Sequence, residues 1–152
     1  MSDMADVYRA PLRSRDDSID PRATVGRARR LGRCGFGQQV RNPAEAERLA
    51  ARVDRFAAAA DGSFVWTRDQ DGLFWLGRLD GPYFRDDDDD AVAVDLVHVR
   101  PCSWLDEPLL EAEVPAAVIA TFRRGGRNFQ QTHDGSVSQQ TQRIWDRRRP
   151  QG

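Results

Sequence analysis

Apolar residues in the first half of the chain recur at the spacing of helices. The clearest predicted helix opens at Asn42-Pro43 and ends at Gly62, with its apolar side chains on one stripe. That stripe consists of Ala46, Leu49, Val53 and Phe56. A shorter helix is predicted over residues 23–31, because Asp20-Pro21 provides a cap and a first-turn proline, and Gly32 can end it.

The pattern changes to short strands from Phe64 onward. Two aromatic-rich runs, 64–68 and 73–79, flank an Asp-Gly-containing turn at 69–72, which predicts a β-hairpin. Residues 91–100 place apolar side chains on both faces and predict a strand that becomes buried on both sides. Short strands or turns are also expected at 7–13, 34–37, 82–85 and 129–132, and helices at 116–121 and 141–148. This succession predicts an α+β fold around a small curled sheet or barrel.

The chain has the size and composition of one globular domain. Its 152 residues suit a single domain, and 39% of them are hydrophobic. The domain is expected over residues 6–148, with flexible tails at 1–5 and 149–152. No apolar stretch approaches the roughly 18 residues of a membrane span, and the N-terminus lacks the apolar region of a secretory signal. These features predict a cytoplasmic protein with no membrane partner.

The net charge of −1 hides an uneven distribution of charge. All 23 basic residues are Arg, against 24 acidic residues, and the chain contains no Lys. Residues 1–60 carry a net charge of +4, residues 61–122 carry −10 and residues 123–152 carry +5. Two basic ends around an acidic middle suit a polyanionic partner. The codon bias of a GC-rich coding sequence is the alternative explanation for the absence of Lys.

The motifs of common enzymes are absent from the sequence. It has no Walker loop, no G-x-G-x-x-G after a strand and no G-x-S-x-G. Cys34 and Cys102 are far apart in sequence and are expected to be reduced structural thiols. The five aspartates at 86–90 lack the alternating ligands of a calcium loop, so a solvated hairpin tip is expected rather than a metal site. We therefore predict no catalytic residue, no metal and no cofactor.

Large aromatic residues and an arginine-rich loop suggest a binding site. The aromatic residues in or just after predicted strands are Trp66, Trp75, Tyr83 and Trp104. The loop after the helix at 116–121 contains Arg123, Arg124, Arg127, Asn128 and Gln130 around two glycines. Aromatic rings that stack on bases, arginines that grip phosphates and amides that contact base edges are a recurrent solution for nucleic-acid binding. Core packing of the aromatics and a plain basic surface loop are the alternatives.

The order of these segments resembles the PUA-like superfamily, and within it the EVE and YTH-like branch. The segments that carry the resemblance are 7–13, Asp20-Pro21, Gly35-Phe36-Gly37, GSFVWTR at 62–68, FWLGRLDGPY at 74–83, VHVRPCSW at 97–104, VPAAV at 114–118 and FQQT at 129–132. The resemblance implies a small, strongly curved β-barrel flanked by helices. It also implies a reader domain, in which a flipped or single-stranded modified base enters an aromatic pocket beside a basic groove.

The aromatic pattern and the resemblance together assign residues to the expected site. Candidates for the base pocket are Phe36, Trp66, Trp75, Tyr83 and Trp104. Candidates for contacts with the nucleic-acid backbone are Arg13, Arg100, Arg123, Arg124 and Arg127, and those for the base edge are Asn128 and Gln130. The chain departs from the family pattern at Gly37, which is followed by Gln38 where Trp is common, and at the acidic run 86–90.

The leading hypothesis is a non-catalytic module that recognises a modified base, in DNA rather than RNA. A separate nuclease or defence protein is a further expected partner, because domains of this branch recur beside restriction and other defence enzymes. The alternative is a protein–protein adaptor with an acidic docking edge, which full burial of Trp66, Trp75 and Trp104 without a pocket would favour. The third hypothesis is a small hydrolase or nuclease that uses His133, Asp134 and Asp95.

Overall fold

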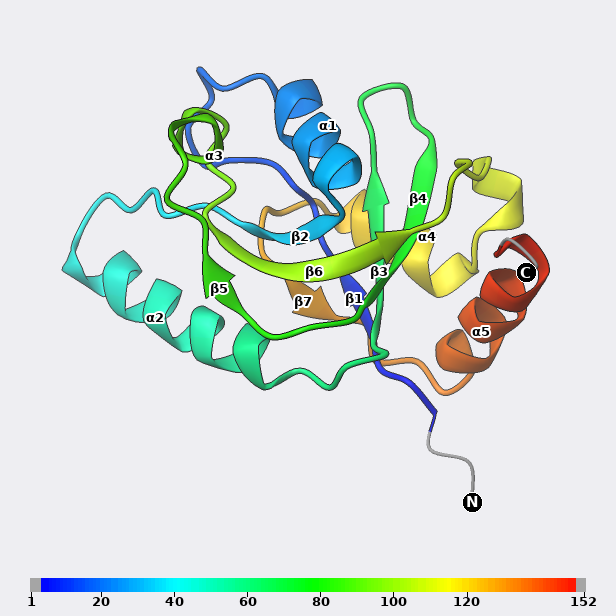
Figure 1. The fold of residues 1–152 in the computed structure, drawn as a ribbon. Coiled ribbons are helices and arrows are strands. Elements are labelled where there is room, and N and C mark those ends of the chain that lie inside the picture. The colour runs from blue at the N-terminus through cyan, green and yellow to red at the C-terminus, as the bar shows by residue number, and fades with distance from the viewer. Residues whose placement is uncertain (1–3, 150–152) are drawn as a thin grey trace.

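The fold is a strongly curled β-sheet with helices packed around it (Figure 1). The computed structural model describes residues 4–149, and the outer parts of the two predicted tails, 1–3 and 150–152, lie outside the described residues. The strands are β1 (Val7–Arg9), β2 (Arg33–Phe36), β3 (Phe64–Arg68), β4 (Phe74–Leu79), β5 (Phe84–Arg85), β6 (His98–Trp104) and β7 (Gln130–Gln131). The helices are α1 (Pro21–Leu31), α2 (Pro43–Ala58), α3 (Asp89–Ala93), the 3-10 helix η1 (Glu111–Glu113), α4 (Ala116–Arg124) and α5 (Val137–Arg148). The α+β class and the strongly curved sheet are confirmed.

The sheet is mixed, and its curl leaves one seam open. The strands follow the order β2-β6-β4-β3-β1-β7, with β5 beside β6. The predicted hairpin is present as β3 and β4, with Gly72 in their turn at a φ of +83°. β1 runs parallel to β3, and the other strand pairs of the described chain are antiparallel. β2 and β7 end this order without pairing to each other, and we call the space between them the open seam.

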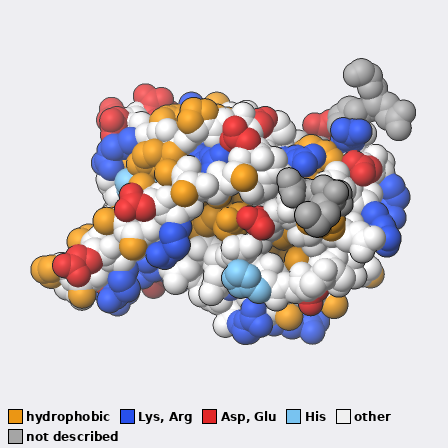
Figure 2. Space-filling model, turned by 90° about the horizontal axis from the view of Figure 1, so that it is seen from below, with side chains coloured by type: hydrophobic (Ala, Val, Ile, Leu, Met, Phe, Trp, Pro, Cys, Tyr) orange, Lys and Arg blue, Asp and Glu red, His pale blue; other side chains and the backbone are white. Residues whose placement is uncertain are grey.

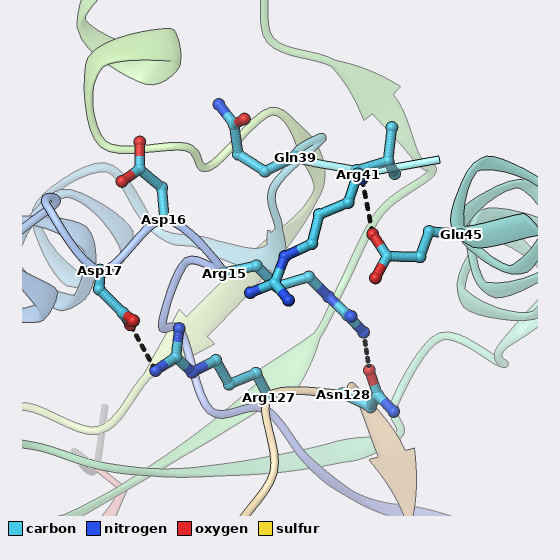
Figure 3. A pocket seen from close by; sticks show the side chains of 9 residues that line it. Arg15, Asp16, Asp17, Gln39, Arg41, Glu45, Arg127 and Asn128 are labelled. Carbon is cyan, nitrogen blue, oxygen red and sulfur yellow. Dashed lines mark hydrogen bonds and ion pairs between the residues drawn. The ribbon is translucent and has the colours of Figure 1, made fainter. Parts of the chain in front are cut away.

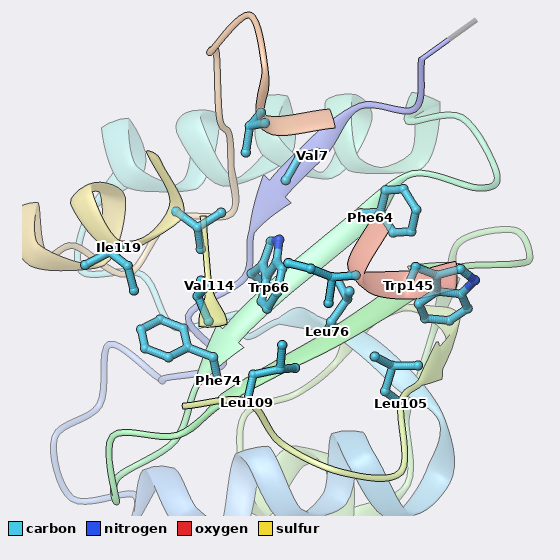
Figure 4. Close-up of a cluster of buried hydrophobic side chains, with 13 residues drawn as sticks. Val7, Phe64, Trp66, Phe74, Leu76, Leu105, Leu109, Val114, Ile119 and Trp145 are labelled. Atoms are coloured by element: carbon cyan, nitrogen blue, oxygen red, sulfur yellow. The ribbon is translucent and has the colours of Figure 1, made fainter. Parts of the chain in front are cut away.

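Alternation along β3 divides its side chains between two cores. Phe64 and Trp66 point toward α4 and α5, whereas Val65 points to the other side and packs with Leu79 inside the curl. Trp66 is fully buried at the centre of the first core (Figure 4), where its Nε1 donates a hydrogen bond to Thr141 Oγ1 at 3.2 Å. This core attaches the two C-terminal helices to one face of the sheet.

α1 begins and ends where the sequence predicts. The side chain of Asp20 accepts a hydrogen bond from the backbone N of Arg22 at 2.9 Å, and Pro21 occupies the first turn. Gly32 ends the helix in the left-handed conformation at a φ of +66°, and a Cβ there would lie 3.2 Å from the carbonyl oxygen of Cys102. Local caps therefore define this helix before any packing is considered.

α2 lies at the edge of the molecule and buries little of its surface (Figure 1). Asn42 caps its N-terminus as predicted, but the helix ends at Ala58 rather than at Gly62. Of the predicted apolar stripe only Phe56 is fully buried, and the other members are half-buried or exposed. Most of the helix therefore faces solvent, and its place on the protein depends on contacts near its C-terminal end.

The acidic run at 86–90 is exposed at its last four aspartates, as predicted, but it leads into a helix instead of forming a hairpin tip, and its first aspartate is buried. Asp86 is only 7% exposed and accepts hydrogen bonds from Arg27, at 3.0 Å, and from Arg33. Desolvation alone would raise the pKa of Asp86, but the hydrogen bond from Arg27 and the charge of Arg33 bring the pKa below the ordinary value for Asp. The following aspartates open the short helix α3, where acidic side chains are favourable.

The strand predicted at 91–100 is wrong in its first half. The chain is helical up to Ala93, and β6 begins only at His98. Between them Asp95 has a left-handed backbone, with a φ of +52°, which turns the chain away from an extended path. Ala91 and Leu96 are buried on the two sides of this turn. Alternating apolar residues around a tight turn resemble a strand in sequence, so the pattern alone could not distinguish this helix and turn from a strand.

Replacing Asp86 by Ala should destabilise the fold by about 3 kcal/mol, because the buried guanidinium of Arg27 loses its partner. Asp89→Ala is the matched control, since it removes an exposed carboxylate from the same run and should cost less than about 0.5 kcal/mol. Urea denaturation measures both free energies of unfolding. Equal effects of the two substitutions would contradict an internal role for Asp86.

Candidate functional site

Aromatic side chains fill the open seam between β2 and β7. Phe129, just before β7, stacks on Tyr8 with ring centroids 4.7 Å apart, and its centroid lies 4.8 Å from that of Phe56. Phe36, at the end of β2, lies 5.1 Å from Phe56 and 6.3 Å from Phe129. Ring pairs at such distances attract one another. Phe36, Phe129 and Tyr8 are only half-buried, so the seam presents an aromatic strip near the surface.

A cavity of about 820 Å³, which we call the α2 cavity, lies between α2 and β7. Arg48, Arg52 and Arg55 line it from the helix. The residues opposite and beneath them include Asp6, Tyr8, Asn128, Phe129, Gln130, Gln131 and His133. Figure 2 shows basic side chains along the projecting helix and a hollow between this helix and the body of the protein. One wall is therefore cationic, and the other offers rings and amides.

The arginines of α2 share one face of the helix, since they lie four and then three residues apart. In the described chain none of the three forms an ion pair. Burial lowers the pKa of Arg52 from its ordinary value, and the charges of Arg15, Arg55 and Arg48 lower it further. A bound anion would relieve this repulsion, so the charge arrangement favours an anionic ligand.

A second cavity, of about 520 Å³, continues past Asn128, which lines both cavities. Figure 3 shows the side chains of Arg15, Arg41 and Arg127 extending into it from three segments of the chain. Arg15 donates a hydrogen bond to Asn128 Oδ1 at 2.5 Å, and Arg127 pairs with Asp17 at 2.6 Å. We call this the loop cavity, and the α2 cavity and the loop cavity together are the arginine groove.

A narrow cavity of about 20 Å³, enough for about one water molecule, lies where the two parts of the groove meet. Phe36 and Phe129 line this junction cavity together with the carboxylate of Asp95. Asp95 is 3% exposed and accepts hydrogen bonds from Ser14 Oγ at 2.5 Å and from the backbone N of Gln38 at 2.8 Å. The aromatic strip therefore has a buried, hydrogen-bonded carboxylate beside it.

Backbone strain gathers at the same junction. Leu12 and Asp95 have φ angles of +51° and +52°, and no other non-glycine residue between positions 4 and 149 has a positive φ. Asp95 lines the junction cavity, and Leu12 directly precedes Arg13, which also lines it. Such conformations cost about 1–3 kcal/mol each and cluster at functional sites. The two strained residues therefore lie at or next to the junction cavity.

A buried arginine fixes the C-terminal end of α2. The guanidinium of Arg100, 2% exposed, donates hydrogen bonds to the carbonyl oxygens of Phe56 at 3.0 Å, Gly81 at 2.9 Å and Ala59, and pairs with Asp61 at 2.7 Å. These partners surround the guanidinium of Arg100, which the sequence predicts as a contact to the nucleic-acid backbone. Arg100 therefore positions the cationic wall of the groove, and its guanidinium is enclosed by protein atoms.

A second buried arginine fixes the facing wall. Arg9 on β1 donates to the carbonyl oxygens of Thr121 at 2.8 Å, Gly125 at 2.6 Å and Asn128 at 3.3 Å, and to Gln130 Oε1 at 3.1 Å. Hydrogen bonds from a charged donor are about twice as strong as neutral ones. Arg9 therefore joins α4, β7 and the segment between them through one guanidinium group.

The structure brings some of the predicted site residues together and disperses the others. Those that line the groove or its junction are Phe36, Arg13, Arg127, Asn128 and Gln130. Arg123 instead pairs with Glu111 at 2.8 Å, and Arg124 is exposed at the end of α4. The loop predicted as a unit is thus divided, and only its second half faces the groove.

The other predicted aromatic residues do not line the arginine groove. Trp66 is in the core, and Trp75 is 6% exposed beneath the guanidinium of Arg29, 3.3 Å from its ring centroid. The indole nitrogen of Trp104 donates to a backbone carbonyl of β2 at 3.0 Å, and the hydroxyl of Tyr83 hydrogen-bonds to a histidine of β6 at 2.8 Å. The adaptor hypothesis would be favoured if all three tryptophans were fully buried, but Trp104 is only half-buried.

Several residues of the groove are absent from the sequence-based assignment. They are Tyr8, Arg15, Arg41, Arg48, Arg52, Arg55 and Phe129. The spacing of the three α2 arginines was visible in the sequence as a basic stripe on a helix with a separate apolar face. For the others no local pattern exists, because the curl of the sheet is what brings them to the seam.

The residues of the hydrolase hypothesis do not share a cavity. His133 lines the α2 cavity, Asp95 lines the junction cavity, and Asp134 accepts a hydrogen bond from the backbone N of Ser136 at the start of α5. Within residues 4–149, no group of three or more His, Cys, Asp or Glu side chains is placed to hold a metal ion. The same residues contain no helix with the length and apolar character to cross a membrane.

Comparison with known proteins finds similarity in structure and none in sequence families. The chain is similar to the solved YTH domain of the Zygosaccharomyces rouxii MRB1 protein in complex with N6-methyladenosine RNA. The TM-score is 0.52 at 11% sequence identity, and the alignment covers 94% of this chain and 88% of that one. No family model and no curated protein matches the sequence. At this identity the similarity shows a shared fold, which is the YTH-like form of the predicted architecture.

Replacing Arg100 by Gln should detach the end of α2 and lower the free energy of unfolding by about 3 kcal/mol, because buried carbonyl oxygens lose their donors. Hydrogen exchange should accelerate at the backbone amides near Phe56 more than in α5. Arg55→Gln, an exposed change on the same helix, should alter stability by less than about 0.5 kcal/mol. Unchanged exchange in α2 would contradict the anchoring role.

The pKa of buried His98 is lowered by desolvation and then by the charge of Arg85. The unfolded chain therefore takes up its proton first as the pH falls. The free energy of unfolding should be constant above about pH 6.5 and should decrease below it, through the lower pKa of the folded state. Urea denaturation between about pH 5 and 8 measures this profile.

His98→Gln should flatten that profile, whereas His133→Gln, at an exposed position, should leave it unchanged. A profile that His133→Gln alone flattens would show that His98 is not the titrating group.

Proposed function

We propose that this protein is a non-catalytic module that binds single-stranded nucleic acid in the arginine groove and recognises a modified base there. The observation that carries the proposal is the pairing of a cationic wall on α2 with an aromatic and amide wall across the open seam. The YTH domain with which the chain shares its fold was solved with N6-methyladenosine RNA, which supports the same proposal.

The phosphate groups of the strand would lie along α2. A planar guanidinium matches a phosphate through two parallel hydrogen bonds, and Arg48, Arg52 and Arg55 form no ion pair among the described residues that would compete. Arg41 continues the line of guanidinium groups into the loop cavity, whose lining also contains Asp16, Asp17 and Glu45. A ligand held in this way should bind less tightly as the salt concentration rises.

The bases would lie against the opposite wall. Tyr8 and Phe129 offer stacking surfaces, each worth about 1–3 kcal/mol per base in comparable sites. The amide oxygen of Asn128 already accepts from Arg15, and that of Gln130 accepts from Arg9. With its oxygen so occupied, each of these exposed amides has its NH₂ group to offer as a donor, so the wall suits base edges that present acceptor atoms.

The kind of strand and its partners belong to the same proposal. The resemblance of the sequence to EVE-type readers favours modified DNA, whereas the structural neighbour was solved with RNA, so both must be assayed. The same resemblance favours a separate nuclease or defence protein that acts on the bound strand.

Fluorescence anisotropy with single-stranded DNA and RNA, each plain, cytosine-modified or adenine-modified, tests the proposal. One modified strand should bind at least about fivefold more tightly than its plain counterpart. Arg52→Gln should weaken binding to every strand and reduce the slope of log K against log salt by about 0.7, because one phosphate contact is lost.

Arg143→Gln removes the same charge from an exposed position on α5, on the other side of the molecule from α2 (Figure 1), and should leave binding unchanged. Phe129→Leu should reduce the preference for the modified base while keeping the salt dependence. If no strand binds at low salt, or if both arginine variants lose affinity equally, the groove is not the binding site.

A further inference from the structure

A fourth cavity lies beyond the junction, on the side away from α2. It has a volume of about 430 Å³, and we call it the turn cavity because the β3–β4 turn forms one of its walls. Its lining includes Arg13, Arg68, Asp69, Phe122, Gly125, Gly126 and Arg127. Arg13 and Arg127 also line the junction cavity, so the turn cavity adjoins the arginine groove through these two side chains.

The charge of the turn cavity is positive. Arg13 and Arg68 are exposed, and within residues 4–149 neither forms an ion pair. The carboxylate of Asp69 accepts hydrogen bonds from two backbone N–H groups of its own turn, at 2.9 and 3.0 Å, and from Trp75 Nε1 at 2.9 Å. Arg13 and Arg68 therefore bring two guanidinium groups without an ion pair to a cavity whose carboxylate already accepts hydrogen bonds from its own turn, and Arg127, which pairs with Asp17, lines the same cavity.

The loop wall of the turn cavity carries no side chain at two successive positions. Gly125 and Gly126 have φ angles of +77° and +101°, conformations that favour glycine. A Cβ at Gly125 would meet nothing within 4 Å, so no neighbouring atom requires this position to be small. At Gly125 the backbone is consequently open to close approach by a ligand, whereas a Cβ at Gly126 would lie 3.3 Å from a guanidinium nitrogen of Arg9. The half-buried ring of Phe122 lies in the same wall.

We infer that the turn cavity is a second phosphodiester subsite for the strand that occupies the arginine groove, and this inference rests on the proposed function. A strand that leaves the aromatic strip between Arg13 and Arg127 would place its next phosphate within reach of Arg68. Arg13 and Arg127 line both regions, whereas Arg68 lines the turn cavity and a neighbouring cavity of about 170 Å³ and is not part of the lining of the arginine groove. The ligand class is therefore a single strand long enough to span both sites.

Anisotropy titrations with single strands of about 4 and about 10 nucleotides test this inference, since site sizes of other single-strand binders cover this range. Arg68→Gln should weaken binding of the longer strand about fivefold and leave the shorter strand unaffected. Arg13→Gln should weaken both. Arg147→Gln, an exposed charge change on α5, should affect neither strand.

The outcomes separate the two proposals. If both strands bind and Arg68→Gln weakens neither, or weakens both equally, the second subsite is wrong while binding in the groove stands. If neither strand binds the unaltered protein, both proposals fall. The subsite is supported if Arg68→Gln weakens binding of the longer strand and leaves binding of the shorter strand unchanged.

Discussion

The architecture of the site follows from one constraint, which is that the curled sheet does not close by hydrogen bonds. β2 and β7 end the strand order without pairing in the described chain, so aromatic rings fill the space that a further ladder would occupy. Rings in contact give no fixed register, unlike paired backbones. The elements over the seam therefore need other anchors, and two buried arginines on β1 and β6 supply them.

Arginine has two separate roles in this protein. Arg9 and Arg100 are buried and donate mainly to backbone carbonyl oxygens, whereas among the described residues the arginines of α2 form no ion pair. A guanidinium is more weakly hydrated than an ammonium and carries five donors in a plane, so it tolerates burial where several carbonyls converge. A chain whose basic residues are all Arg can therefore serve both roles. The net charge of the chain does not distinguish buried structural arginines from those that line the groove.

Much of the fold could be predicted from the sequence, and much of the site could not. The caps of α1 and α2 and the β3–β4 turn are local, so residues such as Asp20, Asn42 and Gly72 indicate them directly. The error at 91–100 arose because a left-handed turn at Asp95 imitates strand alternation. Trp66 shows why the site could not be predicted in the same way, because the orientation of β3 determines whether its ring enters a core or a groove.

The attachment of α2 at its C-terminal end has a mechanical consequence. Its 16 residues span about 24 Å, and in the described chain no side-chain hydrogen bond or ion pair joins its first three turns to another helix or strand. If such a helix pivoted about its fixed end near Phe56, a rotation of about 5° would displace the far end by about 2 Å. Such a rotation would change the width of the groove more beside Arg48 than beside Arg55. Ligands of different thickness could be admitted at the open end while the spacing at the fixed end stays the same.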